Sequence, residues 1–236
     1  MLEGLEKATA AVAALDEPLR RRMYLFIRAA EKPVTRDEAA AHVGISRKLA
    51  AFHLERLVDA GMLVAGSPRP GVGEVRGRGR IPKVYEPSGL EIDVSIPERR
   101  YELAGELLAA AIDRRRPGEP SADAALRVAR ERGAEMGRKA QTKVRGRRRT
   151  DLARAVVAEL ERSGFEPARA SDGSVILRNC PFKDLARFSP ELMCSMNQAL
   201  IDGMVRGVGH PALDAELDPD PGRCCVRIRE PERAPS

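Results

Sequence analysis

The sequence predicts an α+β protein with three parts: a small helical head with a β-hairpin, a helical middle region, and a C-terminal part with antiparallel strands. Apolar residues repeat at helical spacing through most of the first two parts, and period-two alternation follows Gly164. Aromatic residues make up 3% of the chain, so Leu, Val, Ile and Ala must form the core, which favours helices. The expected boundaries are 1–90, 91–165 and 166–236.

Three helices are expected in the head, and each follows a residue whose side chain can cap it. These capping residues are Asp16, Thr35 and Ser46. The helices should end near Pro33, His42 and Ala60, with a turn at Gly44 between the second and the third. Two strands, 62–65 and 81–85, then form a hairpin. This order of elements predicts a winged helix-turn-helix. The alternative is a three-helix domain whose basic face is simply exposed to solvent.

In a helix-turn-helix, the second helix of the motif enters the major groove with its N-terminus first. Arg47 and Lys48 stand at that end and could read guanine or hold phosphates, while Ala51 lets the backbone approach the bases. His53 and Arg56 lie further along and are expected to touch phosphate. The full set of expected DNA-contacting residues is Ser46, Arg47, Lys48, Ala51, His53, Arg56, Arg76, Arg78, Arg80 and Lys83.

The three wing arginines belong to a Gly-Arg loop, 75–80, between the two hairpin strands. Alternate glycines would let each arginine approach the minor groove, although such runs also occur as plain linkers. The formal net charge of +6 and the pI near 9.4 indicate a polyanionic partner. Double-stranded DNA is therefore the expected partner of the head.

Helices are expected in the middle region at 97–113, 122–140 and 150–163, the last one capped by Thr150. The stretch 138–149 holds seven basic residues and no acid. It could contact phosphate or another acidic surface, or form a solvated loop. Because a single head reads half a site, a homodimer is expected, and the first of these helices is the natural interface.

All four cysteines lie in the C-terminal part, at Cys180, Cys194, Cys224 and Cys225. Thiolates select zinc, cuprous copper or iron–sulfur clusters. The chain has no pair of cysteines separated by two to four residues, the spacing usual in structural zinc sites, and widely spread cysteines suit a cluster held in a folded pocket. The alternative is that the cysteines are small buried apolar residues. His210 is either a fourth metal ligand or an ordinary loop residue.

Strands are expected around 175–177, 215–217 and 224–228, and a helix from Ser189 should bury one face of methionine and leucine residues. On the last strand, alternation places Cys224 inward and Cys225 outward. Cys224 is then the better ligand, and Cys225 becomes one only if the strand bends.

Four segments together resemble the SufR-type branch of the ArsR-like bacterial regulators, namely 79–85, 179–182, 190–194 and 221–225. The resemblance implies a dimeric repressor of iron–sulfur cluster assembly operons that binds a cluster and holds DNA more tightly with the cluster in place. It implies Cys180, Cys194 and Cys224 as ligands. The doubled Cys224-Cys225 departs from the family's three-cysteine pattern, so either could be the third ligand. Three cysteines suit a 4Fe-4S cluster with one open iron; a 2Fe-2S cluster is the alternative.

The chain is expected to be cytoplasmic and not bound to a membrane, because it has no long apolar run and no signal-peptide core. No small-molecule substrate is expected. It is not expected to be an enzyme, since a nucleophilic Cys180 or Cys194 would need a nearby base that the sequence does not offer. A winged-helix regulator with a zinc or thiol-redox sensing tail is the alternative function.

Overall fold

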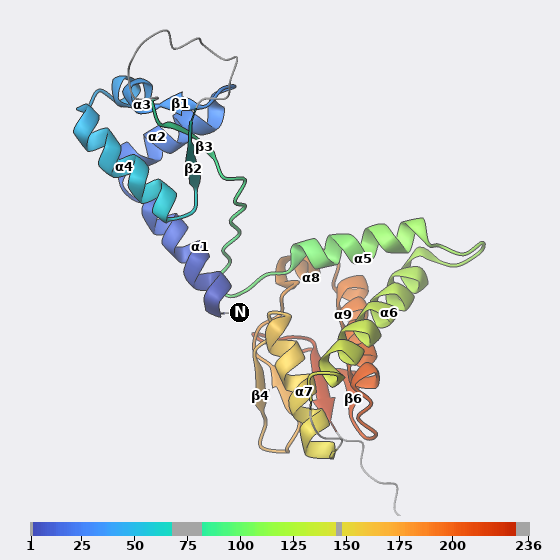
Figure 1. Ribbon diagram of the computed structural model, residues 1–236. Coiled ribbons are helices and arrows are strands. Elements are labelled where there is room, and N and C mark those ends of the chain that lie inside the picture. Colours follow the sequence, from blue (N-terminus) through green and yellow to red (C-terminus); the bar gives the residue numbers. More distant parts are fainter. Residues whose placement is uncertain (1, 68–81, 145–147, 230–236) are drawn as a thin grey trace, which may run out of the picture. The chain divides into compact units, whose positions relative to one another are not determined.

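The computed structural model describes residues 2–67, 82–144 and 148–229. The chain divides into two compact units, residues 1–94 and 95–236. The helices expected in the middle region therefore belong to the same unit as the cysteine-bearing residues. Both units combine helices with an antiparallel sheet, so the protein is α+β as expected (Figure 1).

The first unit has four helices and three short strands among its described residues. The helices are α1 (Leu2–Ala14), α2 (Pro18–Ala29), α3 (Arg36–Val43) and α4 (Arg47–Asp59). The strands are β1 (Val34–Thr35), β2 (Leu63–Gly66) and β3 (Val84–Pro87). They form an antiparallel sheet in the order β1-β3-β2, and the β2–β3 register pairs Leu63 with Pro87 and Gly66 with Val84. This is the architecture of a winged helix-turn-helix.

The turn between α3 and α4 forms as the sequence predicts. Thr35 and Glu38 make a reciprocal capping box at the start of α3. Gly44 ends α3 with a φ of 73°, a conformation that glycine adopts without steric cost. Ser46 then accepts a hydrogen bond from the Leu49 amide at 3.2 Å and so begins α4. These local signals fix the geometry of the helix-turn-helix.

Other details of the head differ from the expectation. Glu17, not Asp16, caps α2, because its carboxylate accepts hydrogen bonds from the amides of Leu19 and Arg20 at 3.1 and 2.7 Å. The helix ends at Ala29 rather than near Pro33. Two elements, α1 and β1, were not expected. The two-residue strand β1 is too short to show any periodicity, and it is held by pairing with β3.

The second unit has five helices and four strands among its described residues. The helices are α5 (Tyr101–Asp113), α6 (Ser121–Gln141), α7 (Arg149–Arg162), α8 (Lys183–Phe188) and α9 (Pro190–Val208). The strands are β4 (Pro167–Arg169), β5 (Val175–Leu177), β6 (Asp214–Leu217) and β7 (Val226–Arg229). The sheet order is β4-β5-β7-β6, with every neighbouring pair antiparallel.

The sequence placed most of these elements correctly and missed some details. Thr150 is not the cap of α7, because the helix already begins at Arg149 and its N-cap is Arg148. The three-residue strand β4 was not predicted and is stabilised by pairing with β5. The methionine face expected for α9 is confirmed, since Met196, Leu200 and Met204 are fully buried.

The second unit is built around an unusually close contact between α6 and α9. Gly133 and Gly137 on α6 lie against the backbone of α9, and Gly203 and Gly207 on α9 lie against the backbone of α6. A Cβ atom added at Gly133 would overlap the carbonyl oxygen of Leu200 and stand 2.8 Å from its carbonyl carbon. Only glycine lets two backbones approach in this way. The contact fixes the position of α9, which carries one of the four cysteines.

Candidate nucleic-acid interface and thiol site

Helix α4 buries one face in the core of the head and leaves the opposite face exposed. Ala50, Leu54 and Leu57 are fully buried. Their spacing of three and four residues keeps them on one side of the helix. Arg47 and Lys48 are exposed at the N-terminal end, as major-groove contacts require.

The expected contacts near the start of α4 are partly engaged within the head. The Ser46 hydroxyl is used to cap the helix. Arg47 pairs with Asp37 on α3 at 2.9 Å, and both side chains are more than half exposed, 68% and 60%. An exposed pair of this kind is worth about 1 kcal/mol or less, so a phosphate or a guanine can replace Asp37. Ala51 is half-buried and leaves room for close approach.

The structure corrects the role expected for His53. This side chain is only 6% exposed, and its Nδ1 lies 3.4 Å from the Glu17 carboxylate. His53 follows the buried Ala50 by three residues and precedes the buried Leu57 by four, so it falls on the inner face of α4. It therefore packs the head and does not face a phosphate.

Two apolar residues on the exposed face of α4 were missed. Phe52 is 51% exposed and Leu49 is 40% exposed. Phe52 lies one turn after Lys48, and the Arg56 guanidinium stands 5.4 Å from the centre of its ring. The four-residue spacing from Lys48 could have identified Phe52 as a surface residue of the recognition helix. Large apolar groups exposed here suit contact with thymine methyl groups.

The wing is described only at its base. Arg76, Arg78 and Arg80 lie outside the described residues. Lys83, at the start of the returning strand, is exposed, and its Nζ is 6.0 Å from the centre of the Tyr85 ring. Lys83 is thus available to a polyanion beside the helix-turn-helix.

The four cysteines of the second unit come from three separate segments. Cys180 follows β5, Cys194 lies in the first turns of α9, and Cys224 and Cys225 directly precede β7. The backbone of the doubled pair is fixed on both sides. The Cys224 amide donates to the Leu177 carbonyl at 2.8 Å, and the Cys225 carbonyl accepts from the Asp218 amide at 2.8 Å.

The expectation that Cys225 points outward is wrong. Cys224 is 1% exposed and Cys225 is 9% exposed, so both lie in the core. Strand β7 begins only at Val226, and the alternation of side chains that holds within a strand does not apply to the residues before it. Both members of the pair can therefore take part in one buried site.

Asn179 holds the loop that carries Cys180. Its Nδ2 donates to the carbonyls of Gly164 at 2.6 Å and Glu98 at 2.9 Å. Its Oδ1 accepts from the Arg99 guanidinium at 2.6 Å. Because this buried amide is satisfied on both ends, it fixes the position of Cys180.

The four thiols interact in a chain from Cys180 through Cys224 and Cys225 to Cys194. Interaction with the Cys224 thiol lowers the pKa of Cys180, and the same neighbour lowers the pKa of Cys225 to about 6. Burial, followed by the Cys225 thiol, raises the pKa of Cys194 to about 12. The Cys180 thiol raises the pKa of Cys224. Cys180 and Cys225 are thus the favoured thiolates, and their neighbours act as S–H donors.

A buried amide with an unpaired oxygen lies beside these thiols. Asn197 on α9 is 1% exposed, and its Nδ2 donates to the Cys224 sulfur at 3.2 Å. Its Oδ1 has no hydrogen-bond partner among the described residues. Leaving a buried acceptor unpaired costs about 1–3 kcal/mol, so this position suits a further group at the site.

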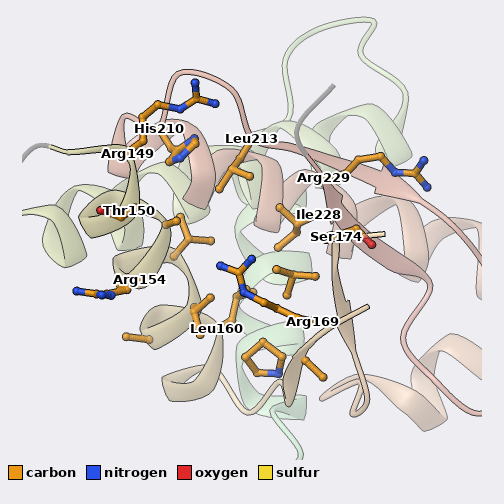
Figure 2. A pocket seen from close by; sticks show the side chains of 18 of the residues that line it. Arg149, Thr150, Arg154, Leu160, Arg169, Ser174, His210, Leu213, Ile228 and Arg229 are labelled. Carbon is orange, nitrogen blue, oxygen red and sulfur yellow. The ribbon is translucent and has the colours of Figure 1, made fainter. Parts of the chain in front are cut away.

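The thiols fit a metal centre by their chemistry, since sulfur donors select zinc, cuprous copper and iron–sulfur clusters. Within residues 2–67, 82–144 and 148–229, no three Cys, His, Asp or Glu side chains are grouped closely enough to hold a metal ion. His210 lies in the loop after α9, is 6% exposed, and accepts a hydrogen bond at Nδ1 from the Ala212 amide at 3.3 Å. It lines a cavity beside α7, as Figure 2 shows.

Comparison with known proteins identifies the head. Residues 15–64 match a family model described as a helix-turn-helix domain. This match spans α2, α3, α4 and the start of β2. Searches of curated proteins and of solved structures returned no match. No helix in the described part of the chain could cross a membrane. The chain therefore carries a DNA-binding helix-turn-helix domain of the kind found in transcriptional regulators.

Proposed function

We propose that this protein is a dimeric repressor whose affinity for its operator is controlled by an iron–sulfur cluster on its C-terminal cysteines. The observation that carries the proposal is the meeting of four thiols from three chain segments, two of them buried, in a unit separate from the helix-turn-helix. By the family resemblance, the regulated genes are those of cluster assembly.

The DNA-reading part of the proposal rests on the exposed face of α4. Arg47 and Lys48 stand where the recognition helix meets guanine edges or phosphates. Leu49 and Phe52 add apolar surface suited to thymine methyl groups. Lys83 contributes a backbone contact from the base of the wing. The operator half-site should therefore contain thymine next to guanine.

Cys180, Cys194 and Cys224 would hold the cluster, with Cys225 as the alternative to Cys224. When bound, such a cluster supplies a centre that responds to oxidation, nitric oxide or iron supply. The chain's own residues fix the sulfur positions: Asn179 anchors the loop of Cys180, and the Leu177 carbonyl anchors Cys224. Asn197 donates a hydrogen bond to the Cys224 sulfur, and its interaction with Cys225 lowers the pKa of that thiol.

Control of DNA binding then depends on whether the thiol-bearing segments are held in fixed positions. Three sulfur atoms on one centre would tie α9, the loop after β5 and the segment before β7 together. Two subunits joined through α5, which leaves Ile112 78% exposed, would hold their recognition helices one helical turn of DNA apart. Loss of the cluster frees these segments and the fixed spacing. A tenfold loss of affinity needs about 1.4 kcal/mol of coupling, a typical value for allostery.

A second candidate function is a regulator with a thiol-redox tail. The lowered pKa of Cys225, about 6, makes a thiolate available at neutral pH beside another thiol. A two-electron oxidant such as a peroxide would accept the electrons as two neighbouring thiols form a disulfide, and an external dithiol would reduce it again, so this reversible bond would replace the cluster as the switch. A zinc-holding tail is the remaining form of this alternative.

Analysis of the full chain purified without oxygen tests these functions. The proposal predicts visible absorption together with iron and acid-labile sulfide, and loss of both in C180S and C194S. Comparing C224S with C225S then identifies the third ligand. The same samples are used to select binding sites from a random double-stranded DNA library. A colourless protein with zinc, or with neither metal nor sulfide, contradicts the cluster proposal, while failure to enrich any DNA sequence contradicts the regulator.

A further inference from the structure

A cavity of about 900 Å³ lies in the second unit between α7 and the strands β4, β5 and β7 (Figure 2). Its volume is within the range of small-molecule sites. The described residues that line it include no cysteine and no residue of α4. It is therefore a different place from both the thiol site and the DNA-reading surface.

Apolar side chains form part of the cavity wall. Val157 and Ala158 line it from α7, and both are half-buried, so part of their surface is open to a ligand. Val175 on β5 and Ile228 on β7 line it from the sheet, where they are paired neighbours. A ligand that enters this cavity must therefore bring an apolar body.

Arginine side chains surround the apolar wall. The lining arginines are Arg149, Arg154, Arg169 and Arg229. The two acids that line the cavity are Glu161 and Asp172, and Asp172 is already engaged by Arg227 at 3.0 Å and by Ser174. Figure 2 shows the exposed Arg169 reaching from β4 toward the middle of the cavity. Arg154 lies 3.9 Å from Asp151 and Arg229 pairs with Glu216 at 2.9 Å, so Arg169 is the lining arginine placed to meet the anionic head of a ligand.

The same two strands lead from the cavity to the thiols. β5 starts at Val175 in the cavity wall and ends at Leu177, whose carbonyl accepts the hydrogen bond from the Cys224 amide. β7 starts directly after Cys225 and ends with the cavity residues Ile228 and Arg229. A local opening of β5 and β7 that exposes Cys224 and Cys225 would thus also disrupt the cavity wall.

We propose that this cavity binds a small amphipathic carboxylate, and that its occupancy restrains β5, β7 and the cysteine pair that precedes β7. Alkylation of a buried thiol requires local opening. A ligand that binds only the closed form reduces the open population by the factor 1 + [L]/Kd. Binding and restraint need neither DNA nor a bound cluster, so this inference stands apart from the proposed function.

The first test compares two ligands with the same chain and opposite charges, decanoate and decyltrimethylammonium, on the reduced, metal-free full chain. Each is titrated against bound anilinonaphthalene sulfonate. We expect decanoate to bind at least about tenfold more tightly, because its head can form charge-assisted hydrogen bonds. R169Q should weaken decanoate binding by about tenfold. Ala153 is a half-buried residue of α7 that lines the cavity, and A153W should abolish binding by filling it. R206Q, a 71% exposed arginine outside the cavity, should change nothing.

The second test measures alkylation of the Cys224-Cys225 peptide by iodoacetamide, followed by mass spectrometry. At a decanoate concentration ten times its Kd, the rate should fall about tenfold in the wild type and stay unchanged in A153W. In R169Q, the same decanoate concentration should slow alkylation less than in the wild type. This variant replaces A153W in the test if A153W does not fold. Equal binding of the two ligands, or insensitivity to both R169Q and A153W, overturns the site. Bound decanoate with an unchanged alkylation rate overturns the restraint.

Discussion

Replacing Gly133 by alanine should strongly destabilise the second unit. The added Cβ would overlap the Leu200 carbonyl oxygen and lie 2.8 Å from its carbonyl carbon and 2.9 Å from the Met204 amide nitrogen. Carbon atoms in van der Waals contact stand about 3.5–4.0 Å apart, so α6 and α9 must separate by about 1 Å. All three obstacles are backbone atoms, which no side-chain rotation can move.

The cost in stability follows from the dispersion energy that is lost when the two helices separate. A gap of about 1 Å removes a quarter to a half of the dispersion energy of each contact across it. Met196, Leu200 and Met204 are fully buried on α9, and a buried side chain of this size makes contacts worth several kcal/mol in sum. We therefore expect G133A to cost about 3 kcal/mol or more, at or above the upper end of the usual cost of overpacking and a large part of a typical domain stability of about 5–15 kcal/mol.

The matched control is Gly105, an exposed glycine within α5 whose added Cβ would meet nothing within 4 Å. G105A should stabilise the protein by up to about 1 kcal/mol, because alanine favours the helix. Scanning calorimetry of both variants separates the transitions of the two units. For G133A, the transition of the second unit should move down by roughly 10 °C or more. If G133A and G105A unfold alike, the backbone contact between α6 and α9 does not exist.

Three further predictions concern DNA reading and the thiols. Replacing thymine by deoxyuracil in the selected half-site removes only a methyl group. This change should weaken the binding of the wild type about three- to tenfold and leave the binding of F52A unaffected. Equal affinities of the wild type for the two duplexes would exclude the methyl contact. H53A should lower the stability of the head by about 1–3 kcal/mol while the salt dependence of DNA binding stays unchanged, since His53 is buried; a reduced salt slope would restore its phosphate role. In the reduced, metal-free chain, thiolate absorbance should show a first midpoint near pH 6 from Cys225, and a first midpoint above pH 8 would contradict the chain of thiols. Because the pKa of Cys225 is lower in the folded state, its contribution to the free energy of unfolding is present above the unfolded pKa of about 8.5 and declines as the pH falls toward 6. The pKa of Cys194 is raised in the folded state, so Cys194 lowers the free energy of unfolding as the pH rises above about 8.5.

The head could be read from the sequence because its signals are local. Thr35, Gly44 and Ser46 each set the backbone within three residues of themselves, and the structure confirms all three. His53 was misplaced because the choice of inner face depends on the register of the whole helix. Phe52 was missed because an exposed aromatic residue has no distinct sequence pattern of its own.

The thiol site was less accessible from the sequence because its geometry depends on contacts between distant segments. The cysteines could be identified as a possible site from their spacing, but the burial of Cys225 follows from where β7 begins. Strand β4 exists because β5 pairs with it, and Asn197 gains its role only beside Cys224. The glycines of α6 and α9 stand four residues apart on each helix, a visible pattern whose meaning appears once the two helices are seen in contact.

In the proposed function, the thiol site controls the affinity of the helix-turn-helix for DNA. The most direct measurement is the affinity of one oxygen-free sample for its selected DNA duplex, by fluorescence anisotropy at fixed salt, before and after a chelator removes the metal. The account predicts that affinity falls at least about tenfold in step with the loss of visible absorption, and that reconstitution restores both. Equal affinities of the two forms for the same duplex would contradict it.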